Sequence, residues 1–259
     1  MTKDAVVELR EGGVLWLTFD RPKARNAMTF EMYDVLEQTA RRANDDAAVR
    51  ALVVTGASGA FVAGTDIAQF SDFRTSEQAF AYEERMDRVL GALEAVRKPT
   101  IAAIAGASTG GGLAIAAACD LRIATSSATF GMPIARTLGN CLSIGNLVRL
   151  ASLIGAARVK ELIFTARIIT AEEANAFGLV TEVVSDDLAL LARVEQLAGS
   201  MSSHAPLTLW ATKEGLRRVR ERMLPEEGRD LVALCYTSED FREGVRAFIE
   251  KRKPQWKGK

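Results

Sequence analysis

The most apolar stretch of the chain, residues 101–119, is interrupted by Gly106 and by the run Gly110-Gly111-Gly112. Glycines at this density would leave backbone hydrogen bonds exposed in lipid, which argues against a transmembrane helix. The pattern instead predicts a buried strand, a glycine turn and a buried helix. Such a turn lets a ligand approach the backbone, and free amides at the start of the following helix can hold negative charge.

A second glycine-rich turn, from Gly56 to Gly64, follows the apolar run 51–55 and leads into Thr65 and Asp66. The apolar run predicts a fully buried strand. Neither turn matches a known phosphate loop, because the GxGxxG pattern is absent and no Lys-Ser or Lys-Thr follows the glycines. We therefore disfavour nucleotide ligands. Taken alone, each turn is explained as well by close packing of a helix against a sheet.

Strand and helix patterns alternate through the first half of the chain. Residues 14–19 predict a strand, residues 29–44 a helix with Thr29 as N-cap, residues 76–96 a helix and residues 100–105 a strand. This alternation implies an α/β fold with parallel strands and right-handed crossovers. Beyond Gly131 helical patterns dominate, at residues 144–153, 156–164, 171–177, 188–200 and 206–221. We expect a core over residues 1–195 and a helical C-terminal region over residues 196–259.

The charge balance and the cysteine content limit which binding partners and which cellular compartment are expected. Lys+Arg and Asp+Glu both number 33, so the electrostatic footprint of a nucleic-acid binder is missing and neither nucleic acid nor a membrane is expected as partner. Cys119, Cys141 and Cys235 form no CxxC pair, and residues 1–10 lack a signal sequence, which favours a reducing cytoplasm. His204 is the single histidine and precedes a predicted helix, so we expect a loop histidine and no metal site.

Six sequence blocks occur in an order that resembles the crotonase, or enoyl-CoA hydratase/isomerase, superfamily. They are Arg21-Pro-Lys-Ala-Arg-Asn-Ala-Met28, Phe61-Val-Ala-Gly-Thr-Asp-Ile67, Lys98-Pro99, Gly106 to Asp120, Phe130-Gly131 and the helical Thr212-Lys213 segment. The resemblance covers nearly the whole chain. It implies a crotonase-like ββα spiral core with a helical C-terminal trimerisation region, and a homotrimer or a dimer of trimers.

The resemblance also implies a substrate and its contacts. By motif position, the backbone N–H groups of Thr65 and Gly111 would hold the carbonyl oxygen of an acyl-CoA thioester, and two such donors stabilise an enolate-like charge. No cofactor is implied beyond the coenzyme A of the substrate itself. The residues at the positions of the CoA contacts are Lys23, Ala24, Arg25, Ala63, Phe248 and Lys251. Without the resemblance, the three cations among them would be taken as ordinary solvated charge.

The chain departs from the hydratases of this superfamily at both catalytic glutamates, whose positions are occupied by Ala114 and Ile134. A positioned acid or base is commonly worth about 10²–10⁴ in rate, so we expect most hydratase activity to be missing. Four residues that follow the Gly56–Gly64 turn are candidates for substitute proton carriers, or for ordinary charge on a solvated helix: Asp66, Asp72, Glu77 and Tyr82.

Polar residues gather after Pro133, where Asn140 and Ser143 follow an insertion of one residue relative to the hydratase pattern. They are candidates for orienting water or substrate in a rebuilt site, or for capping a helix. We expect Cys141 between them to be a packing thiol, and Asp120 and Arg122 to pair structurally.

Three functions remain open on the sequence. The first is an acyl-CoA enzyme of the hydratase/isomerase group with a different acid/base set. The second is a CoA-thioester binding protein with little catalysis, because the predicted oxyanion hole survives and the glutamates do not. The third is hydrolysis, or another thioester reaction, that uses Asn140 and Ser143.

Overall fold

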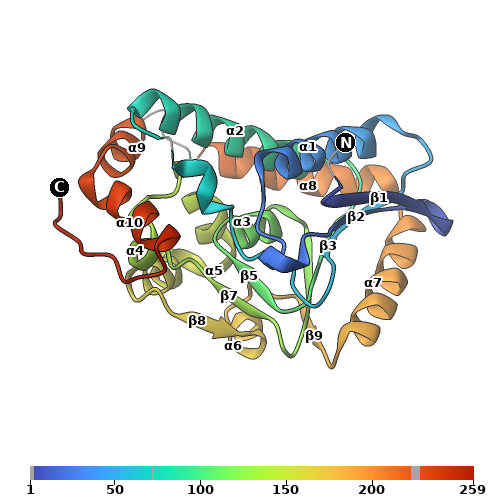
Figure 1. Cartoon of the computed structure of the whole chain (residues 1–259). Helices are drawn as coiled ribbons and strands as arrows, with labels where there is room; N and C mark the ends of the chain where they lie inside the picture. Colours follow the sequence, from blue (N-terminus) through green and yellow to red (C-terminus); the bar gives the residue numbers. More distant parts are fainter. Residues whose placement is uncertain (1–2, 72, 223–227) are drawn as a thin grey trace.

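The computed structural model describes residues 3–71, 73–222 and 228–259. Its larger sheet has six strands in the spatial order β1-β2-β3-β4-β6-β9, and all but the antiparallel pair β1–β2 are parallel (Figure 1). Its strands are β1 (Ala5–Arg10), β2 (Val14–Phe19), β3 (Ala51–Gly56), β4 (Thr100–Ile104), β6 (Leu121–Thr125) and β9 (Glu182–Val184). A smaller sheet contains β5 (Ala107–Thr109), β7 (Thr129–Gly131) and β8 (Ile168–Thr170).

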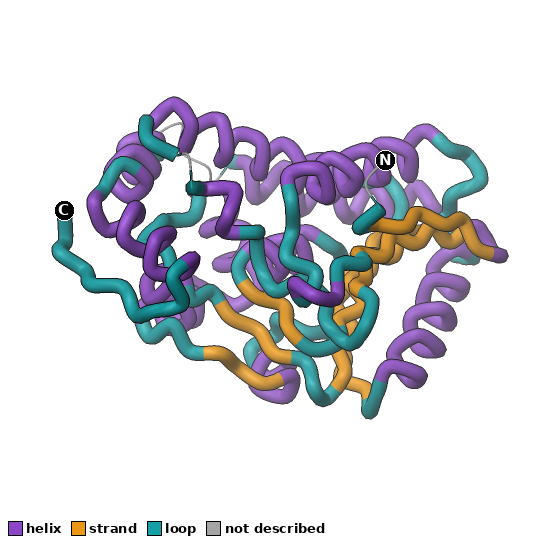
Figure 2. Tube along the Cα trace, in the orientation of Figure 1, coloured by secondary structure: helices purple, strands orange, loops and turns teal. Residues whose placement is uncertain are grey.

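Helices cover both faces of the larger sheet (Figure 2). They are α1 (Phe30–Asp45), α2 (Ser76–Glu94), α3 (Gly111–Ala118), α4 (Ile134–Thr137), α5 (Ile144–Phe164), α6 (Ala171–Ala176), α7 (Asp187–Ser202), α8 (Pro206–Glu221), α9 (Arg229–Tyr236) and α10 (Glu239–Ile249). As predicted, Thr29 caps α1, its side chain accepting the Met32 N–H at 3.3 Å.

The central strands explain why their sequences are apolar without alternation. On β3, Leu52 and Val54 join the core beneath α1, α2 and α3, whereas Ala51 and Val53 join a separate core beneath α7. Since successive side chains of a strand point to opposite faces, a strand covered on both sides needs apolar residues throughout. The predicted parallel strands are confirmed at β2, β3 and β4.

The structure contains several elements that the sequence-based prediction lacks. Strand β1 was not predicted, since it lies at the sheet edge and most of its side chains are partly or fully exposed. The two helices predicted at 144–153 and 156–164 are one helix, α5, interrupted at Gly155, where φ is +75°. Strands β5 to β9 were not predicted either: β6 has five residues, and the others have three each. Helices α9 and α10 also lie beyond the last predicted helix.

The C-terminal helices pack on their own chain. Helix α9 contacts α2, and α10 contacts the 3₁₀ turn Ile67–Phe70 and α4, at the left of Figure 1. An apolar cluster containing Phe70, Leu138 and Tyr236 joins these elements. The domain boundary expected between residues 195 and 196 falls inside α7, and the division stays a prediction. No described helix is long and apolar enough to cross a membrane.

Candidate active site

The two glycine turns meet at one cavity of about 410 Å³. Helix α2, helix α4, the 140–142 segment and α9 supply the remaining walls. Most of its lining is apolar, and its polar groups are concentrated near the glycine turns and near α9. A mainly apolar cavity with a few convergent polar groups is the usual form of a small-molecule site.

Two backbone amides on the cavity wall have no protein acceptor within the described residues. The Met28 N–H donates to the Gly64 carbonyl, and the Met28 carbonyl accepts from the Asp66 N–H, which forms a parallel bridge between the two segments. The N–H of the intervening Thr65 therefore points away from Met28. Gly111 is the first residue of α3, and an N–H at that position has no intrahelical acceptor. Both residues line the cavity. The arrangement can hold an anionic oxygen, and the helix dipole favours the same charge.

Close contacts require glycine at position 111. A Cβ added there would lie 2.3 Å from Tyr33 Oη, 3.0 Å from Thr65 Oγ1 and 3.6 Å from the Thr65 amide nitrogen. The same distances show that residues 65 and 111 approach each other closely. Gly111 therefore brings its amide beside that of Thr65 without a side chain between them.

The position of α3 is fixed at both ends by groups outside the cavity lining. A Cβ on Gly112 would lie 2.1 Å from the Val62 carbonyl oxygen, so the start of the helix is pressed against that segment. At the other end, the buried Arg122 guanidinium donates to the carbonyls of Ala116 and Cys119, at 3.1 and 2.7 Å. Arg122 and Asp120 do contact each other, but through the backbone: Arg122 Nη2 donates to the Asp120 carbonyl at 3.2 Å. The Asp120 carboxylate instead lies 2.6 Å from Lys213 Nζ and accepts from Thr100.

Three hydroxyl groups lie beside the amide pair. Tyr33 Oη is 2.8 Å from Thr65 Oγ1, which is 3.3 Å from Tyr82 Oη. Burial raises the pKa of Tyr33 to about 12 and raises that of Tyr82 well above its usual value. Both tyrosines therefore remain protonated at neutral pH and can donate hydrogen bonds, but they are poor bases.

The positions of the two missing glutamates are apolar surfaces of this cavity. Ala114 on α3 and Ile134 on α4 line it together with Met86 and Leu90 of α2 and Leu142. No carboxylate replaces either glutamate at its own position. This end of the cavity suits an apolar acyl chain rather than a pair of acid/base groups.

One carboxyl group does line the cavity from another element, and the sequence-based prediction missed it. Glu83 of α2 is buried, and its Oε1 accepts a hydrogen bond from Tyr236 Oη of α9 at 2.5 Å. Its pKa is raised to about 7, chiefly by burial and also by the negative charge of Asp87. Hydrogen bonds from Tyr236 and from the Ser143 backbone act in the opposite direction, because they lower the pKa. No ion pair to Glu83 is found in the described part of the chain.

A signal for Glu83 exists in the sequence, although it is weak. The buried positions of α2 are Ala79, Glu83, Met86, Val89, Leu90 and Leu93. Spacings of three and four residues define one helix face, so Glu83 occupies a position of the apolar stripe. Its neighbours Glu84 and Arg85 hide this feature in a run of charged residues.

The structure distributes the predicted site residues unevenly. Seven of them line the cavity: Ala24, Arg25, Ala63, Thr65, Gly111, Asn140 and Phe248. Lys23 and Lys251 are exposed and stand outside its lining. Asn140 Nδ2 lies 3.2 Å from Tyr236 Oη, and its buried Oδ1 has no partner among the described residues.

Ser143 does not share the cavity with Asn140. Its hydroxyl caps α5 by accepting the Asn146 N–H at 3.2 Å, and it donates to Asp87 Oδ1 at 2.8 Å. It lines a neighbouring cavity of about 390 Å³ on the other side of Glu83. The capping interpretation therefore holds for Ser143, and the two polar residues line different cavities.

The other sequence candidates are placed elsewhere or are neutralised. Asp66 lines the cavity but pairs with Arg21 at 2.8 Å. Glu77 is exposed in the first turn of α2, and Asp72 lies outside the described residues. His204, as expected, is an exposed loop residue, and it lines a different cavity beside Arg97. No described group of three or more His, Cys, Asp or Glu residues could hold a metal ion.

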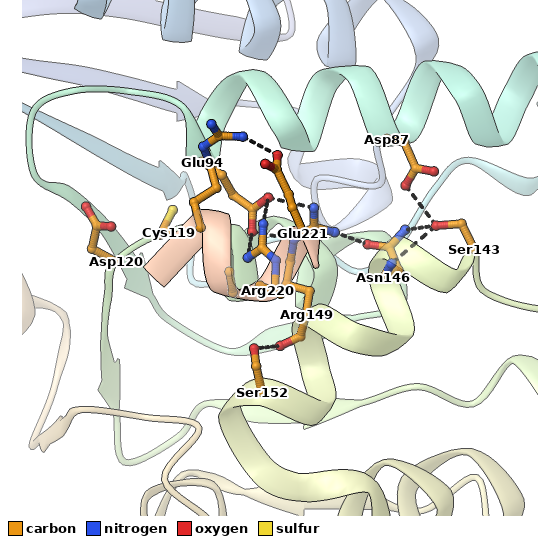
Figure 3. Close-up of polar contacts among 12 residues, drawn as sticks. Asp87, Glu94, Cys119, Asp120, Ser143, Asn146, Arg149, Ser152, Arg220 and Glu221 are labelled. Atoms are coloured by element: carbon orange, nitrogen blue, oxygen red, sulfur yellow. Dashed lines mark hydrogen bonds and ion pairs between the residues drawn. The ribbon is translucent and has the colours of Figure 1, made fainter. Parts of the chain in front are cut away.

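A second carboxylate on α2, that of the partly buried Glu94, lies in a different electrostatic setting. Arg149 of α5 donates to it at 2.7 and 2.8 Å, and Arg220 of α8 pairs with the same carboxylate (Figure 3). Burial opposes ionisation of Glu94, but the hydrogen bonds and charges of both arginines outweigh it and lower its pKa. The network continues through Asn146, which accepts from Arg149 at 2.6 Å, to Ser143 (Figure 3).

Comparisons with known proteins identify the family. The family model "Enoyl-CoA hydratase/isomerase" matches residues 9–259. Crotonyl-CoA hydratase of Syntrophomonas wolfei is 36% identical over 258 residues, which span 98% of each chain. Among solved structures, an enoyl-CoA hydratase/carnithine racemase from Magnetospirillum magneticum aligns over 100% of this chain and 97% of its own, with a TM-score of 0.80 and 32% identity. A methylmalonyl-CoA decarboxylase in complex with 2-nitronate-propionyl-CoA aligns over 100% of both chains, with a TM-score of 0.89 and 30% identity.

The chain therefore belongs to the enoyl-CoA hydratase/isomerase family of enzymes, and the predicted crotonase fold is confirmed. Its relatives carry names of enzymes that act on CoA thioesters.

Proposed function

We propose that the protein binds an acyl-CoA thioester and stabilises an enolate at its acyl group, with the carbonyl oxygen between the amides of Thr65 and Gly111. The observation that carries this proposal is the pair of amides without protein acceptors at one end of an apolar cavity. Donors that are fixed before the reaction favour the charge that develops on the oxygen, because no reorganisation is needed when it appears. The printed names of the relatives support the same substrate class.

The cavity suggests an orientation for the substrate. Arg25 and Ala63, joined by a hydrogen bond from the Ala63 N–H to the Arg25 carbonyl at 3.1 Å, line the cavity beside the loop that follows β2, and with Phe248 of α10, which also lines it, they are suited to contact the CoA portion. Asn26 holds the loop after β2 against the 57–60 turn, because its Nδ2 donates hydrogen bonds to the carbonyls of Ala57 and Ala60 at 2.9 and 2.7 Å. The acyl chain would then extend past the amides toward Ala114 and Ile134.

Hydration of an enoyl-CoA is expected to be slow. Ala114 and Ile134 cannot move protons, so crotonyl-CoA hydration should fall at least about 10³-fold below that of a two-glutamate hydratase. Loss of absorbance of the conjugated thioester measures the rate. A rate comparable to that of a two-glutamate hydratase would show that another carboxylate replaces both glutamates. The two alternatives are a protein that only binds CoA thioesters and one that hydrolyses them. Release of free CoA thiol distinguishes them, because only hydrolysis produces it.

A specific observation favours a second reaction, loss of CO₂ from a 2-carboxyacyl-CoA. The bond from Cα to the carboxylate would break, and its electron pair would pass into the same enolate. This step needs no base, and the apolar surfaces of Ala114 and Ile134 would not repel the substrate carboxylate. The methylmalonyl-CoA decarboxylase structure aligns with this chain along its full length. CO₂ release from methylmalonyl-CoA tests this alternative.

A pair of double variants tests the oxyanion donor itself. Tyr33→Phe removes the hydroxyl that a Cβ at position 111 would meet. In that background, Gly111→Ala adds the Cβ and keeps the N–H, whereas Gly111→Pro adds the Cβ and removes the N–H. We expect the proline variant to process acyl-CoA about 10²–10³-fold more slowly than the alanine variant. Equal rates in the two variants, with equal butyryl-CoA binding by calorimetry, would contradict the assignment of Gly111.

A homotrimer or dimer of trimers and a cytoplasmic location also stay part of this proposal. Light scattering at micromolar concentration tests the assembly, and a monomer would contradict it.

A further inference from the structure

The cavity contains a buried carboxyl group that the proposed chemistry has not yet used. Glu83 is 7% exposed and lines the same cavity as Thr65 and Gly111, although it comes from α2 and not from either glutamate position of the hydratases. Its hydrogen-bond partner Tyr236 also lines the cavity. A buried carboxyl group that faces a ligand cavity and has no cation paired with it is costly for folding. Glu83 is therefore a candidate for a functional role.

The partners of Glu83 orient it without neutralising it. Tyr236 Oη donates at 2.5 Å, and the Ser143 backbone N–H donates as well. Asn140 Nδ2 donates to the Tyr236 hydroxyl at 3.2 Å, so the tyrosine itself is held in place. Helix α5 fixes the Ser143 backbone, because the Ser143 side chain is its N-cap. Three elements therefore set the direction of one carboxyl group.

The electrostatic surroundings keep this group able to both accept and release a proton near neutral pH. Burial raises its pKa to about 7. Five titratable side chains interact with it, from α1, from α2, from the segment before α5 and from α9: Tyr33, Tyr82, Asp87, Cys141 and Tyr236. None of these is a cation. The nearby Arg149 is engaged with Glu94 and Asn146.

We propose that Glu83 is the acid/base residue of this enzyme, and that Tyr236 and Asn140 are the residues that position it. In this step a Glu83 carboxylate oxygen takes a proton from the carbon next to the thioester carbonyl. The electron pair of that C–H bond passes into the enolate, whose oxygen the Thr65 and Gly111 amides hold. Returning the proton to the same carbon restores the substrate, and returning it to another carbon of an unsaturated chain moves the double bond. The inference rests on the proposed function, because the enolate needs the amide pair.

Hydrogen exchange of butyryl-CoA in D₂O tests the step without assuming a product. Mass spectrometry measures deuterium entering the acyl group, and calorimetry measures binding of the same ligand. In the wild type we expect exchange to increase with pH through an inflection near 7, because the ionised carboxylate is the base. Glu83→Gln should lower exchange by about 10² or more, remove the inflection and leave binding nearly unchanged. Glu83→Asp should restore part of the rate, and Glu77→Gln, an exposed residue of the same helix, should match the wild type.

The outcomes separate the two proposals. A loss smaller than tenfold in Glu83→Gln, or an inflection that survives in it, overturns the role of Glu83 and leaves the amide pair untouched. A wild type that binds butyryl-CoA without exchange overturns both. If Glu83→Gln does not fold, Tyr236→Phe decides: loss of its hydrogen bond should move the inflection to higher pH, and an unmoved inflection refutes the proposal.

Discussion

Glu83, which is buried, and Glu94, whose side chain is 9% exposed, lie on one helix, eleven residues or about three turns apart, and they are held in opposite ways. Glu94 faces two guanidinium groups, and Glu83 faces a tyrosine hydroxyl and a backbone amide. Neutral donors satisfy the lone pairs of a buried carboxylate, but they do not balance its charge. Burial consequently prevails at Glu83, whose pKa rises, and the cations prevail at Glu94, whose pKa falls.

The difference separates a carboxylate held by ion pairs from one held by neutral donors. Glu94 joins α2 to α5 and α8, and it lines only the neighbouring cavity of about 390 Å³. Glu83 borders both cavities and has no ion pair among the described residues. Residue type and helix are shared, so the partner groups and the deeper burial of Glu83 account for the opposite pKa shifts.

The largest expected loss of unfolding free energy is at Glu94, the carboxylate that two arginines neutralise. Glu94→Gln leaves Arg149 and Arg220 facing each other without their carboxylate, and breaking a buried ion pair on one side costs about 3–5 kcal/mol of unfolding free energy. Glu37→Gln is the matched control, because Glu37 also pairs with two arginines, Arg41 and Arg88, whose side chains are 64% and 54% exposed. It should cost less than about 1 kcal/mol. Equal losses in chemical denaturation would break the comparison.

The same substitution at Glu83 should have the opposite sign. A folded-state pKa of about 7, above the ordinary glutamate value of 4.5, means that the folded protein binds more protons than the unfolded chain between these pH values. Stability contributed by the protonated group is thus present below pH 4.5 and is lost as pH rises through 7. Glu83→Gln should therefore raise the unfolding free energy by about 1–3 kcal/mol at pH 8, and the gain should shrink toward pH 5. A loss of stability at pH 8 would show that the charge of Glu83 is balanced after all.

A smaller effect is expected from the positioning tyrosine. Tyr236→Phe removes the hydroxyl that donates to Glu83 and keeps the ring within its aromatic cluster. The loss should be about 1 kcal/mol. It should be greater at pH 8 than at pH 5, because hydrogen bonds to an ionised carboxylate are stronger than those to a neutral one. Unfolding curves at both pH values measure the difference, and a loss independent of pH would mean that the tyrosine acts only through packing.

The fold was largely predictable because its signals are local. The strands β2 and β3 are apolar without alternation, the N-cap Thr29 stands directly before its helix, and the glycine turns follow the strands that they terminate. The edge strand β1 and the short strands β8 and β9 lack such signals, since their pairing partners rather than their composition define them.

The site was predictable only where a motif fixes the backbone. The proposed role of the turns at Thr65 and Gly111 depends on backbone N–H groups, whose positions follow from the path of the chain. A resemblance in sequence motifs can therefore locate them. Glu83 gains its properties from Tyr236, 153 residues away, and from the absence of a cation, neither of which is visible along the chain. Ser143 shows the converse case: the sequence left open a role in the site or a helix cap, and the structure shows the cap.

The anchoring of α3 has a consequence for protein engineering. Gly112 against Val62 and Arg122 against the last carbonyls of the helix set where the Gly111 amide stands, and none of these three groups borders the substrate cavity. The proposed oxyanion amide of Gly111 is thus held by contacts that lie outside the cavity wall. We expect substitutions at positions 114 and 134, which do line the cavity, to change its surface while these anchoring contacts stay in place.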